Sequence, residues 1–257
     1  MENVAGRFLL CVQMFRGTRM NFGASSSPRS LMPFLYVILL LLVGLAGGAW
    51  AADRGVAGAV DGANAGASVA TGNKTILVWG DSLSAAFGFE KDKGWPTLLS
   101  EKLASEGFSV NVINGSVAGE TTAGGLARLP RALETHQPEY VLLALGANDG
   151  LRALPPKAMK AQLGKMIGLS QAQGAEVLLF EMKIPPNYGP RYSEAFENVF
   201  HELAAETAVS LVPFFLLDVA LAPEYMQSDN LHPTAEAQPL LLNRIWPVLK
   251  QTLVKQQ

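Results

Sequence analysis

Apolar runs of strand length alternate with amphipathic stretches from residue 75 onward, and this alternation restricts the fold more than any other feature of the sequence. The expected strands, which are short and mostly apolar, lie at 75–80, 108–113, 140–145, 176–180 and 209–212. The expected helices lie at 95–105, 121–135, 155–172, 194–207 and 233–254. Strands that alternate with helices predict a parallel sheet with helices on both faces. Within it we expect the most apolar run, 140–145, to be the central strand.

The end of the chain departs from this regular pattern. Residues 213–228 have no clear period, which predicts an irregular lobe interrupted by Pro223. The helix expected from Pro233 contains Pro239 and Pro247, which predict kinks or interruptions because proline has no N–H to donate within a helix.

The first expected strand ends abruptly in Gly80-Asp81-Ser82. In open α/β sheets, ligands bind beyond the carboxyl ends of the strands. Gly80 permits a sharp exit from the strand and Asp81 suits a turn, so Ser82 can face a cleft. The alternative is a structural junction in which Ser82 only caps the following segment.

Two further strand ends carry glycine and polar residues. The loop 114–121 follows the second expected strand and contains Gly119, and the loop 146–149 follows the third and contains Asn148. Because crossovers between parallel strands are right-handed, all three loops should lie at one edge of the sheet. Asn148 alone is also compatible with an ordinary turn, since asparagine tolerates left-handed backbone geometry.

An aspartate and a histidine near the C-terminus complete a possible charge relay. Asp229 lies three residues before His232, so its carboxylate can fold back and accept the Nδ1–H of the imidazole. The Nε2 atom is then free to take a proton from Ser82. Alternatively, His232 caps the next helix, or Asp229 and His232 are metal ligands. The G-x-S-x-G motif of ordinary α/β-hydrolases is absent.

These residues together resemble a known family. The blocks that carry the resemblance occur in order along the chain: Gly80-Asp81-Ser82-Leu83, Gly119, Gly146-Ala147-Asn148-Asp149 and Asp229-x-x-His232. In order and approximate spacing they resemble the four blocks of the SGNH (GDSL-type) hydrolases. The family implies a three-layer α/β/α, flavodoxin-like fold whose five-stranded parallel sheet has the order 2-1-3-4-5.

Within the family, the resemblance is to the periplasmic acyl-CoA thioesterase I, lysophospholipase L1 and arylesterase subgroup. The supporting stretches are 125–130, 148–152, 186–189, Asn198 and 231–233. The resemblance implies a catalytic triad of Ser82, Asp229 and His232 and an oxyanion hole formed by the backbone N–H groups of Ser82 and Gly119 and the side chain of Asn148. Ala147 departs from the glycine common in the subgroup, and its methyl group should stiffen the loop without removing the asparagine donor.

The expected function is therefore hydrolysis of acyl esters and thioesters through an acyl-enzyme, without a cofactor or a metal. Asp81, Leu151 and Leu154 are the candidate substrate-binding residues, although the leucines could instead pack at a helix start. One alternative is a carbohydrate or acetyl esterase on the same scaffold. Another is a non-catalytic module that binds lipids or glycans.

The N-terminal region predicts export. Residues 34–43 are continuously apolar and are followed by Ala49-Trp50-Ala51, so residues 1–51 are interpreted as a signal peptide that targets a bacterial periplasm or the exterior. An uncleaved anchor, or a start at Met20, is the alternative. Residues 52–73, mostly Ala and Gly, predict a flexible linker before a hydrolase domain at 74–257.

Charge and cysteine content restrict the partners. Without residues 1–51 the chain has 16 basic and 21 acidic residues, a net charge of −5, which argues against nucleic acid as a partner. The single cysteine, Cys11, lies in the leader, so the exported domain would have no disulfide. We expect a monomer that binds a small acyl ester, thioester or lysophospholipid, with no stable membrane insertion once the leader is removed.

Overall fold

The structure is a computed structural model that describes residues 74–255. The signal peptide expected at 1–51 and the linker expected at 52–73 lie outside this range. None of the helices between residues 74 and 255 combines the length and the hydropathy that a bilayer-spanning helix needs.

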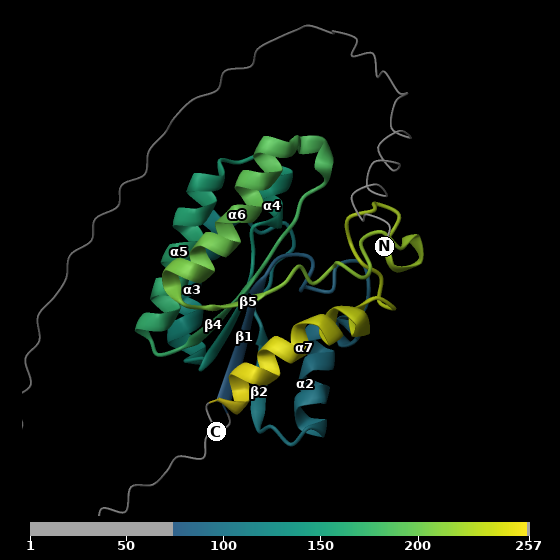
Figure 1. Cartoon of the computed structure of the whole chain (residues 1–257). Helices are drawn as coiled ribbons and strands as arrows, with labels where there is room; N and C mark the ends of the chain where they lie inside the picture. Colours follow the sequence, from purple (N-terminus) through teal and green to yellow (C-terminus); the bar gives the residue numbers. More distant parts are fainter. Residues whose placement is uncertain (1–73, 256–257) are drawn as a thin grey trace, which may run out of the picture. The chain divides into compact units, whose positions relative to one another are not determined.

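Five parallel strands form a single sheet (Figure 1). They are β1 (Lys74–Gly80), β2 (Val110–Asn114), β3 (Tyr140–Ala144), β4 (Glu176–Phe180) and β5 (Ser210–Val212). Their order is β2-β1-β3-β4-β5, with every neighbouring pair parallel. The predicted order and the central position of the run at 140–145 are confirmed. Every residue of β3 is buried, as expected for a central strand covered on both faces.

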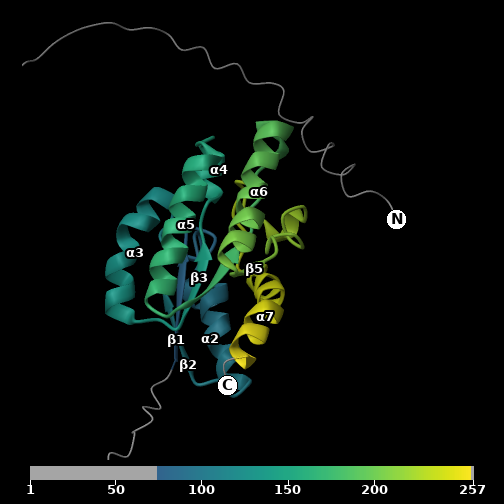
Figure 2. The same ribbon diagram turned by 60° about the vertical axis from the view of Figure 1, so that its left-hand side comes forward.

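Helices cover both faces of this sheet (Figure 2). On one face α2 (Trp95–Ser105) packs against α7 (Gln238–Val254). On the other face lie α3 (Thr122–His136), α5 (Pro156–Ala172) and α6 (Pro190–Thr207), with α5 between its neighbours. The predicted three-layer α/β/α architecture is therefore confirmed.

Aromatic side chains anchor the layer that contains α2 and α7. The ring of Trp95 stacks on Phe180 of β4 at 5.9 Å between centroids, and Phe215 packs edge-on against both. The backbone N–H of Trp95 donates to the side chain of Gln238 over 3.1 Å, which joins the starts of the two helices. The first and last helices of the domain are thus fixed to the same side of the sheet.

The structure corrects the expected start of the last helix. The helix begins at Gln238 and not at Pro233, because Pro233 forms an isolated antiparallel bridge with Met226. Pro239 then lies in the first turn, where a missing N–H costs nothing, so it does not kink the helix. Pro247 is accommodated inside the continuous helix.

Smaller differences concern element ends and short helices. The helix expected from residue 194 begins at Pro190, the strand expected from residue 108 begins at Val110, and the loop expected at 146–149 contains the five-residue helix α4 (Ala147–Leu151). The described residues, 74–255, also contain three 3₁₀ turns: η2 (Lys91–Lys93), η3 (Pro186–Tyr188) and η4 (Pro223–Tyr225). Of these, η4 lies in the lobe that was expected to be irregular.

Candidate active site

Ser82 follows the carboxyl end of β1 in a turn that folds back on Asp81. The backbone N–H groups of Ser84 and Ala85 both donate to the carbonyl of Asp81, at 3.1 and 3.0 Å. The side chain of Asp81 accepts the N–H of Leu83 at 3.0 Å. The aspartate before the serine thus organises the turn through both its carbonyl and its carboxylate.

Asp229 and His232 lie in one tight loop. The Oδ1 atom of Asp229 accepts the backbone N–H groups of Leu231 and His232 at 2.9 and 3.0 Å. Its Oδ2 atom lies 2.6 Å from Nδ1 of His232. Asn230, between them, has a φ of 56°, a left-handed geometry that asparagine tolerates better than most residues. The spacing of three residues therefore folds back as the sequence suggested.

The loop of His232 meets the turn of Ser82. The Nε2 atom of His232 lies 2.8 Å from Oγ of Ser82, across 150 positions of sequence. The ring of Phe87 packs against the imidazole at 4.4 Å between centroids. An ionised Asp229 carboxylate can only accept, so Nδ1 donates to it, and in the neutral imidazole Nε2 is then the atom that accepts the serine proton.

The carboxylate of Asp229 is held in its charged form. Burial alone would raise its pKa, but the hydrogen bonds from the imidazole and from the backbone of His232 and Leu231 outweigh burial and lower the pKa to about 2. The carboxylate is consequently ionised throughout the range in which a histidine can act as a base.

Amide donors lie on the two loops that flank the serine. Gly119 has a φ of +74°, which explains why glycine suits this position. Among residues 74–255, no acceptor is recorded for the backbone N–H of Ser82 or of Gly119. Asn148, in the first turn of α4, donates one side-chain N–H to Oδ2 of Asp81 over 3.2 Å. Its amide can still offer a second N–H to a ligand.

Comparison with known proteins identifies the family. A model of the GDSL-like lipase/acylhydrolase family matches residues 78–239. The chain belongs to this family. The match spans the three strand-end loops described above and the loop of Asp229 and His232, from the last residues of β1 to the start of α7.

Several characterised GDSL-like proteins are similar to this chain over most of their length. The esterase TesA of Pseudomonas aeruginosa is 48% identical over 180 residues, which cover 70% of this chain and 90% of that protein. The thioesterase 1/protease 1/lysophospholipase L1 of Escherichia coli K12 is 44% identical, with coverage of 65% and 79%. A crystal structure of TesA superposes with a TM-score of 0.68 over 69% of this chain and 99% of its own. A structure of the esterase EstA from Pseudoalteromonas, inhibited by monoethylphosphonate, gives the same TM-score at 44% identity over 70% of this chain and 98% of its own.

Asp81, directly before the candidate nucleophile, is completely buried. Burial raises its pKa from 3.8 to about 6, even though the N–H of Leu83, the amide of Asn148 and the charge of His232 all act in the opposite direction. A side chain with no exposed surface cannot easily contact a substrate. Its contacts instead suggest that it orients Asn148.

Asn114 links the loops after β1 and β2, a role that the sequence did not reveal. Its side chain donates to the carbonyl of Ser84 at 2.7 Å and accepts the N–H of Ser116 at 3.1 Å. The segment that carries Ser82 is therefore tied to the segment that leads to Gly119. The position of Asn114 at a strand end was the only signal for it in the sequence.

Asp149 links the loops after β2 and β3 in the same way. This buried carboxylate accepts the backbone N–H and the hydroxyl of Thr122, at 2.8 and 2.6 Å. Thr122 begins α3, directly after the loop that carries Gly119, whereas Asp149 is the neighbour of Asn148 in α4. The sequence placed Asp149 in a motif but gave no indication of its partner.

The candidate acyl-binding leucines lie in a loop that two tyrosines hold. The hydroxyl of Tyr188 donates to the carbonyl of Leu151, and that of Tyr192 donates to the carbonyl of Leu154, both over 2.7 Å. The side chain of Leu154 is 38% exposed, and that of Leu151 is half-buried. The backbone of this loop is thus fixed while at least one of its leucines faces outward.

Between residues 74 and 255, no group of three or more His, Cys, Asp or Glu side chains is arranged to hold a metal ion. Asp229 bonds to His232, and His232 in turn contacts Ser82, which is the order expected of an orienting acid, a base and a nucleophile.

Proposed function

We propose that this protein is a serine hydrolase that cleaves acyl esters and thioesters, with Ser82 as nucleophile, His232 as general base and Asp229 as the orienting acid. The observation that carries the proposal is the chain of short contacts from Ser82 Oγ to His232 Nε2 at 2.8 Å and from His232 Nδ1 to Asp229 at 2.6 Å. A nucleophile, a base and a group that orients the base are the parts that acyl transfer through an activated hydroxyl requires.

In the first step, His232 takes the proton of the Ser82 hydroxyl as the oxygen attacks the substrate carbonyl. Asp229 stabilises the resulting imidazolium through its ionised carboxylate. Negative charge then develops on the carbonyl oxygen, and the N–H groups of Ser82 and Gly119 and the amide of Asn148 donate to it. Fixed donors of this kind cost no reorganisation during the reaction.

In the second step, the imidazolium gives its proton to the departing alcohol or thiol, which leaves the acyl group on Ser82. Water attacks this acyl-enzyme, again with His232 as base, and releases the carboxylic acid and the free serine. No step requires a redox group or a nucleophilic side chain other than Ser82.

The substrate class rests on the similar proteins and on the leucine loop. The similar proteins are named as an esterase, an arylesterase and a thioesterase/protease/lysophospholipase. We propose arylesterase, acyl-CoA thioesterase and lysophospholipase activities for this chain, with Leu151 and Leu154 beside the acyl chain. Asp81, which we considered as a substrate contact, is proposed instead to act through Asn148 because its side chain is fully buried.

Export of the enzyme is a separate proposal that rests on sequence alone. The apolar run at 34–43 and the Ala49-Trp50-Ala51 site support cleavage after Ala51 and release of a monomer into the periplasm or the medium. The mass and the N-terminal sequence of protein recovered from a periplasmic fraction would test it. An intact leader on the recovered protein would favour an anchored enzyme.

The activity is tested with Ser82→Ala. This variant should lose hydrolysis of p-nitrophenyl esters by about three orders of magnitude or more, since the nucleophile is removed while the donors remain. A fluorophosphonate probe should label the wild type at Ser82 and should not label the variant. Circular dichroism serves as the control for folding. A folded Ser82→Ala protein with undiminished turnover would overturn the proposed function.

A further inference from the structure

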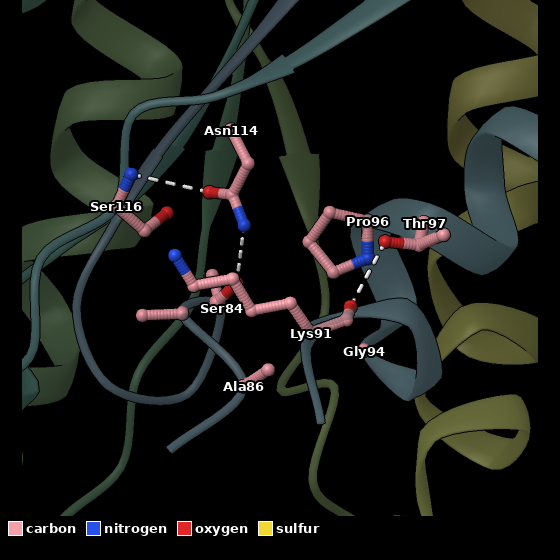
Figure 3. A pocket seen from close by; sticks show the side chains of 9 residues that line it. Ser84, Ala86, Lys91, Gly94, Pro96, Thr97, Asn114 and Ser116 are labelled. Atoms are coloured by element: carbon pink, nitrogen blue, oxygen red, sulfur yellow. Dashed lines mark hydrogen bonds between the residues drawn. The ribbon is translucent and has the colours of Figure 1, made fainter. Parts of the chain in front are cut away.

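A pocket of about 280 Å³ lies beside the turn of Ser82, between the end of β2 and the start of α2 (Figure 3). Its polar lining comes from Ser84, Lys91, Thr97, Asn114 and Ser116. The sheet order places β2 and β3 on opposite sides of β1. The pocket is therefore on the side of the nucleophile opposite to Asn148 and to the leucine loop after β3.

The lining of this pocket contains no carboxylate. Its uncommitted donors are those of Lys91, Ser84 and Ser116, because the hydroxyl of Thr97 donates to the carbonyl of Lys91 and the amide of Asn114 donates to the carbonyl of Ser84. Lys91 has an ammonium group that forms no ion pair with any residue between 74 and 255, and its side chain extends toward Ser84 and Ser116 in Figure 3. The hydroxyls of Ser84, which is 1% exposed, and Ser116 have no hydrogen-bond partner in the same range. Glu90 and Asp92 flank Lys91 in the sequence, but neither lines the pocket. The complementary ligand is an anionic group with several acceptor oxygens.

We propose that this pocket binds the phosphate of the leaving group, a proposal that rests on the proposed function of the neighbouring serine. Ser84 follows Ser82 by two residues, so their Cα atoms are separated by at most about 7 Å. A phosphate joined to the scissile ester through a glycerol unit could span that separation. The acyl chain would extend toward Leu151 and Leu154, on the opposite side of Ser82.

The size of the pocket supports a head group over a larger ligand. Pockets that enclose whole drug-sized molecules usually measure about 300–1,000 Å³, so this one is at the small end. A phosphodiester head group needs only part of such a volume. This favours a glycerophospholipid with a single acyl chain, whose phosphate is close to the ester, over acyl-CoA, whose phosphates are remote from its thioester.

The side chains, and not the start of α2, must supply the binding energy. The backbone N–H of Trp95 already donates to Gln238, and those of Thr97 and Leu98 both donate to the carbonyl of Gly94. Lys91 is consequently the principal charge available to a phosphate. It is exposed and bonds to none of the residues of the proposed triad, so its replacement should not disturb the fold.

Lys91→Met tests the proposal, with Lys93→Met as its matched control. Lys93 lies in the same 3₁₀ turn and is exposed, but it does not line the pocket. The matched substrates are decanoyl-lysophosphatidylcholine and monodecanoylglycerol, which share the ester and the acyl chain and differ in the phosphocholine. Lys91→Met should raise the KM of the lysophospholipid about tenfold, the loss typical of one charged hydrogen bond, while the KM of monodecanoylglycerol and both kcat values stay unchanged. Lys93→Met should change neither substrate.

Parallel assays separate the possible sources of the phosphate. Decanoyl-CoA is compared with decanoyl-N-acetylcysteamine, a thioester without phosphate, and inorganic phosphate is tested as an inhibitor of monodecanoylglycerol hydrolysis. If Lys91→Met raises the KM of decanoyl-CoA alone, the pocket is still a phosphate subsite, but it binds the phosphate of the thioester substrate. If Lys91→Met changes the KM of the phosphorylated and the neutral substrates equally, or changes neither, the proposed phosphate subsite is overturned.

Direct binding distinguishes failure of the subsite from failure of the proposed function. Titration calorimetry with glycerophosphocholine needs no turnover and should show binding to the wild type and at least tenfold weaker binding to Lys91→Met. If the wild type hydrolyses no ester but binds this ligand through Lys91, only the proposed function fails. If esters are hydrolysed and Lys91→Met binds and reacts like the wild type, only the subsite fails.

Discussion

At the scale of single residues, Asp81 combines a cost in stability with a role in the site. Its pKa is raised from 3.8 to about 6 by burial, so the folded protein holds the proton more tightly than the unfolded chain does. Protonation of Asp81 therefore stabilises the fold. This stabilisation is complete below the pKa of the group in the unfolded chain and is lost as the pH rises through its folded pKa of about 6. At neutral pH the buried carboxylate therefore destabilises the fold, by at most about 3 kcal/mol for a shift of roughly two units. The same ionised carboxylate gives Asn148 a charged acceptor, which fixes the orientation of the Asn148 amide.

Asp81→Asn should therefore stabilise the protein while lowering its activity. The free energy of unfolding should exceed that of the wild type at pH 8, and the difference should shrink as the pH falls toward 4, because the wild-type carboxyl becomes protonated there. The kcat should fall because Asn148 loses its ionised acceptor. Urea unfolding at both pH values and p-nitrophenyl ester turnover measure the two effects. A stability difference that did not vary with pH would mean that the buried charge is not its source.

At the scale of elements, the candidate site depends on ties between three loops that come from distant parts of the sequence. Asn114 joins the loop after β1 to the loop after β2, and Asp149 joins the loop after β2 to α4. The sequence predicted which loops would meet because parallel strands end at one edge. It could not predict these bonds, because each depends on a side-chain orientation that emerges only after the sheet has formed. The short helix α4 was missed for a similar reason, since one turn is too short to show a period.

Replacement of Asp149 should affect turnover more than substrate binding. Asp149→Ala leaves the N–H of Thr122 without its acceptor, which should cost about 1–3 kcal/mol of stability. The loosened loops should also lower kcat by at least about tenfold with little change in KM, since the affected donors act on the transition state. Asp149→Asn retains an oxygen acceptor and should recover part of the kcat. A variant in which only KM rises, or in which stability falls and kcat does not, would contradict this positioning role.

The leucine loop gives a prediction about chain length, with a matched control elsewhere on the surface. Leu154→Ala should lower kcat/KM for p-nitrophenyl decanoate several-fold and leave p-nitrophenyl acetate unchanged, because each buried methylene contributes about 0.8 kcal/mol. Leu169, on α5, is exposed to a similar degree, 40% against 38%, and Leu169→Ala should change neither substrate. An unchanged ratio between the two esters in Leu154→Ala would mean that this leucine only packs against the protein.

At the scale of the whole molecule, the sequence was most informative where burial is most complete. The strand at 176–180 and the helix at 95–105 have the bounds that were expected, since both lie in the core and their apolar residues have little freedom to shift. The start of the last helix was wrong because the antiparallel bridge between Pro233 and Met226 holds the residues beside His232 extended, and no local periodicity signals such a bridge. The largest errors, at the start of the last helix and at α4, thus lie near the candidate site, where contacts between loops override local preference.

The shared sheet also predicts that both helical layers unfold together. Trp79, at the end of β1, faces the α3 layer, where its indole donates to the carbonyl of Gly125 and its ring lies 4.2 Å from the guanidinium of Arg128. Trp95 reports on the opposite layer through its stacking on Phe180. In a protein that begins at Ala52, Trp79→Phe leaves the tryptophans of the α2 and α7 layer, Trp95 and Trp246, whereas a variant with both Trp95→Phe and Trp246→Phe leaves only Trp79 in the α3 layer. Within each variant, fluorescence and far-UV circular dichroism should give the same urea midpoint, because neither layer can keep its core once the common strands separate. Fluorescence and dichroism midpoints that differ in either variant would show that one helical layer loosens while the sheet persists, and the domain would then have to be treated as two units of stability.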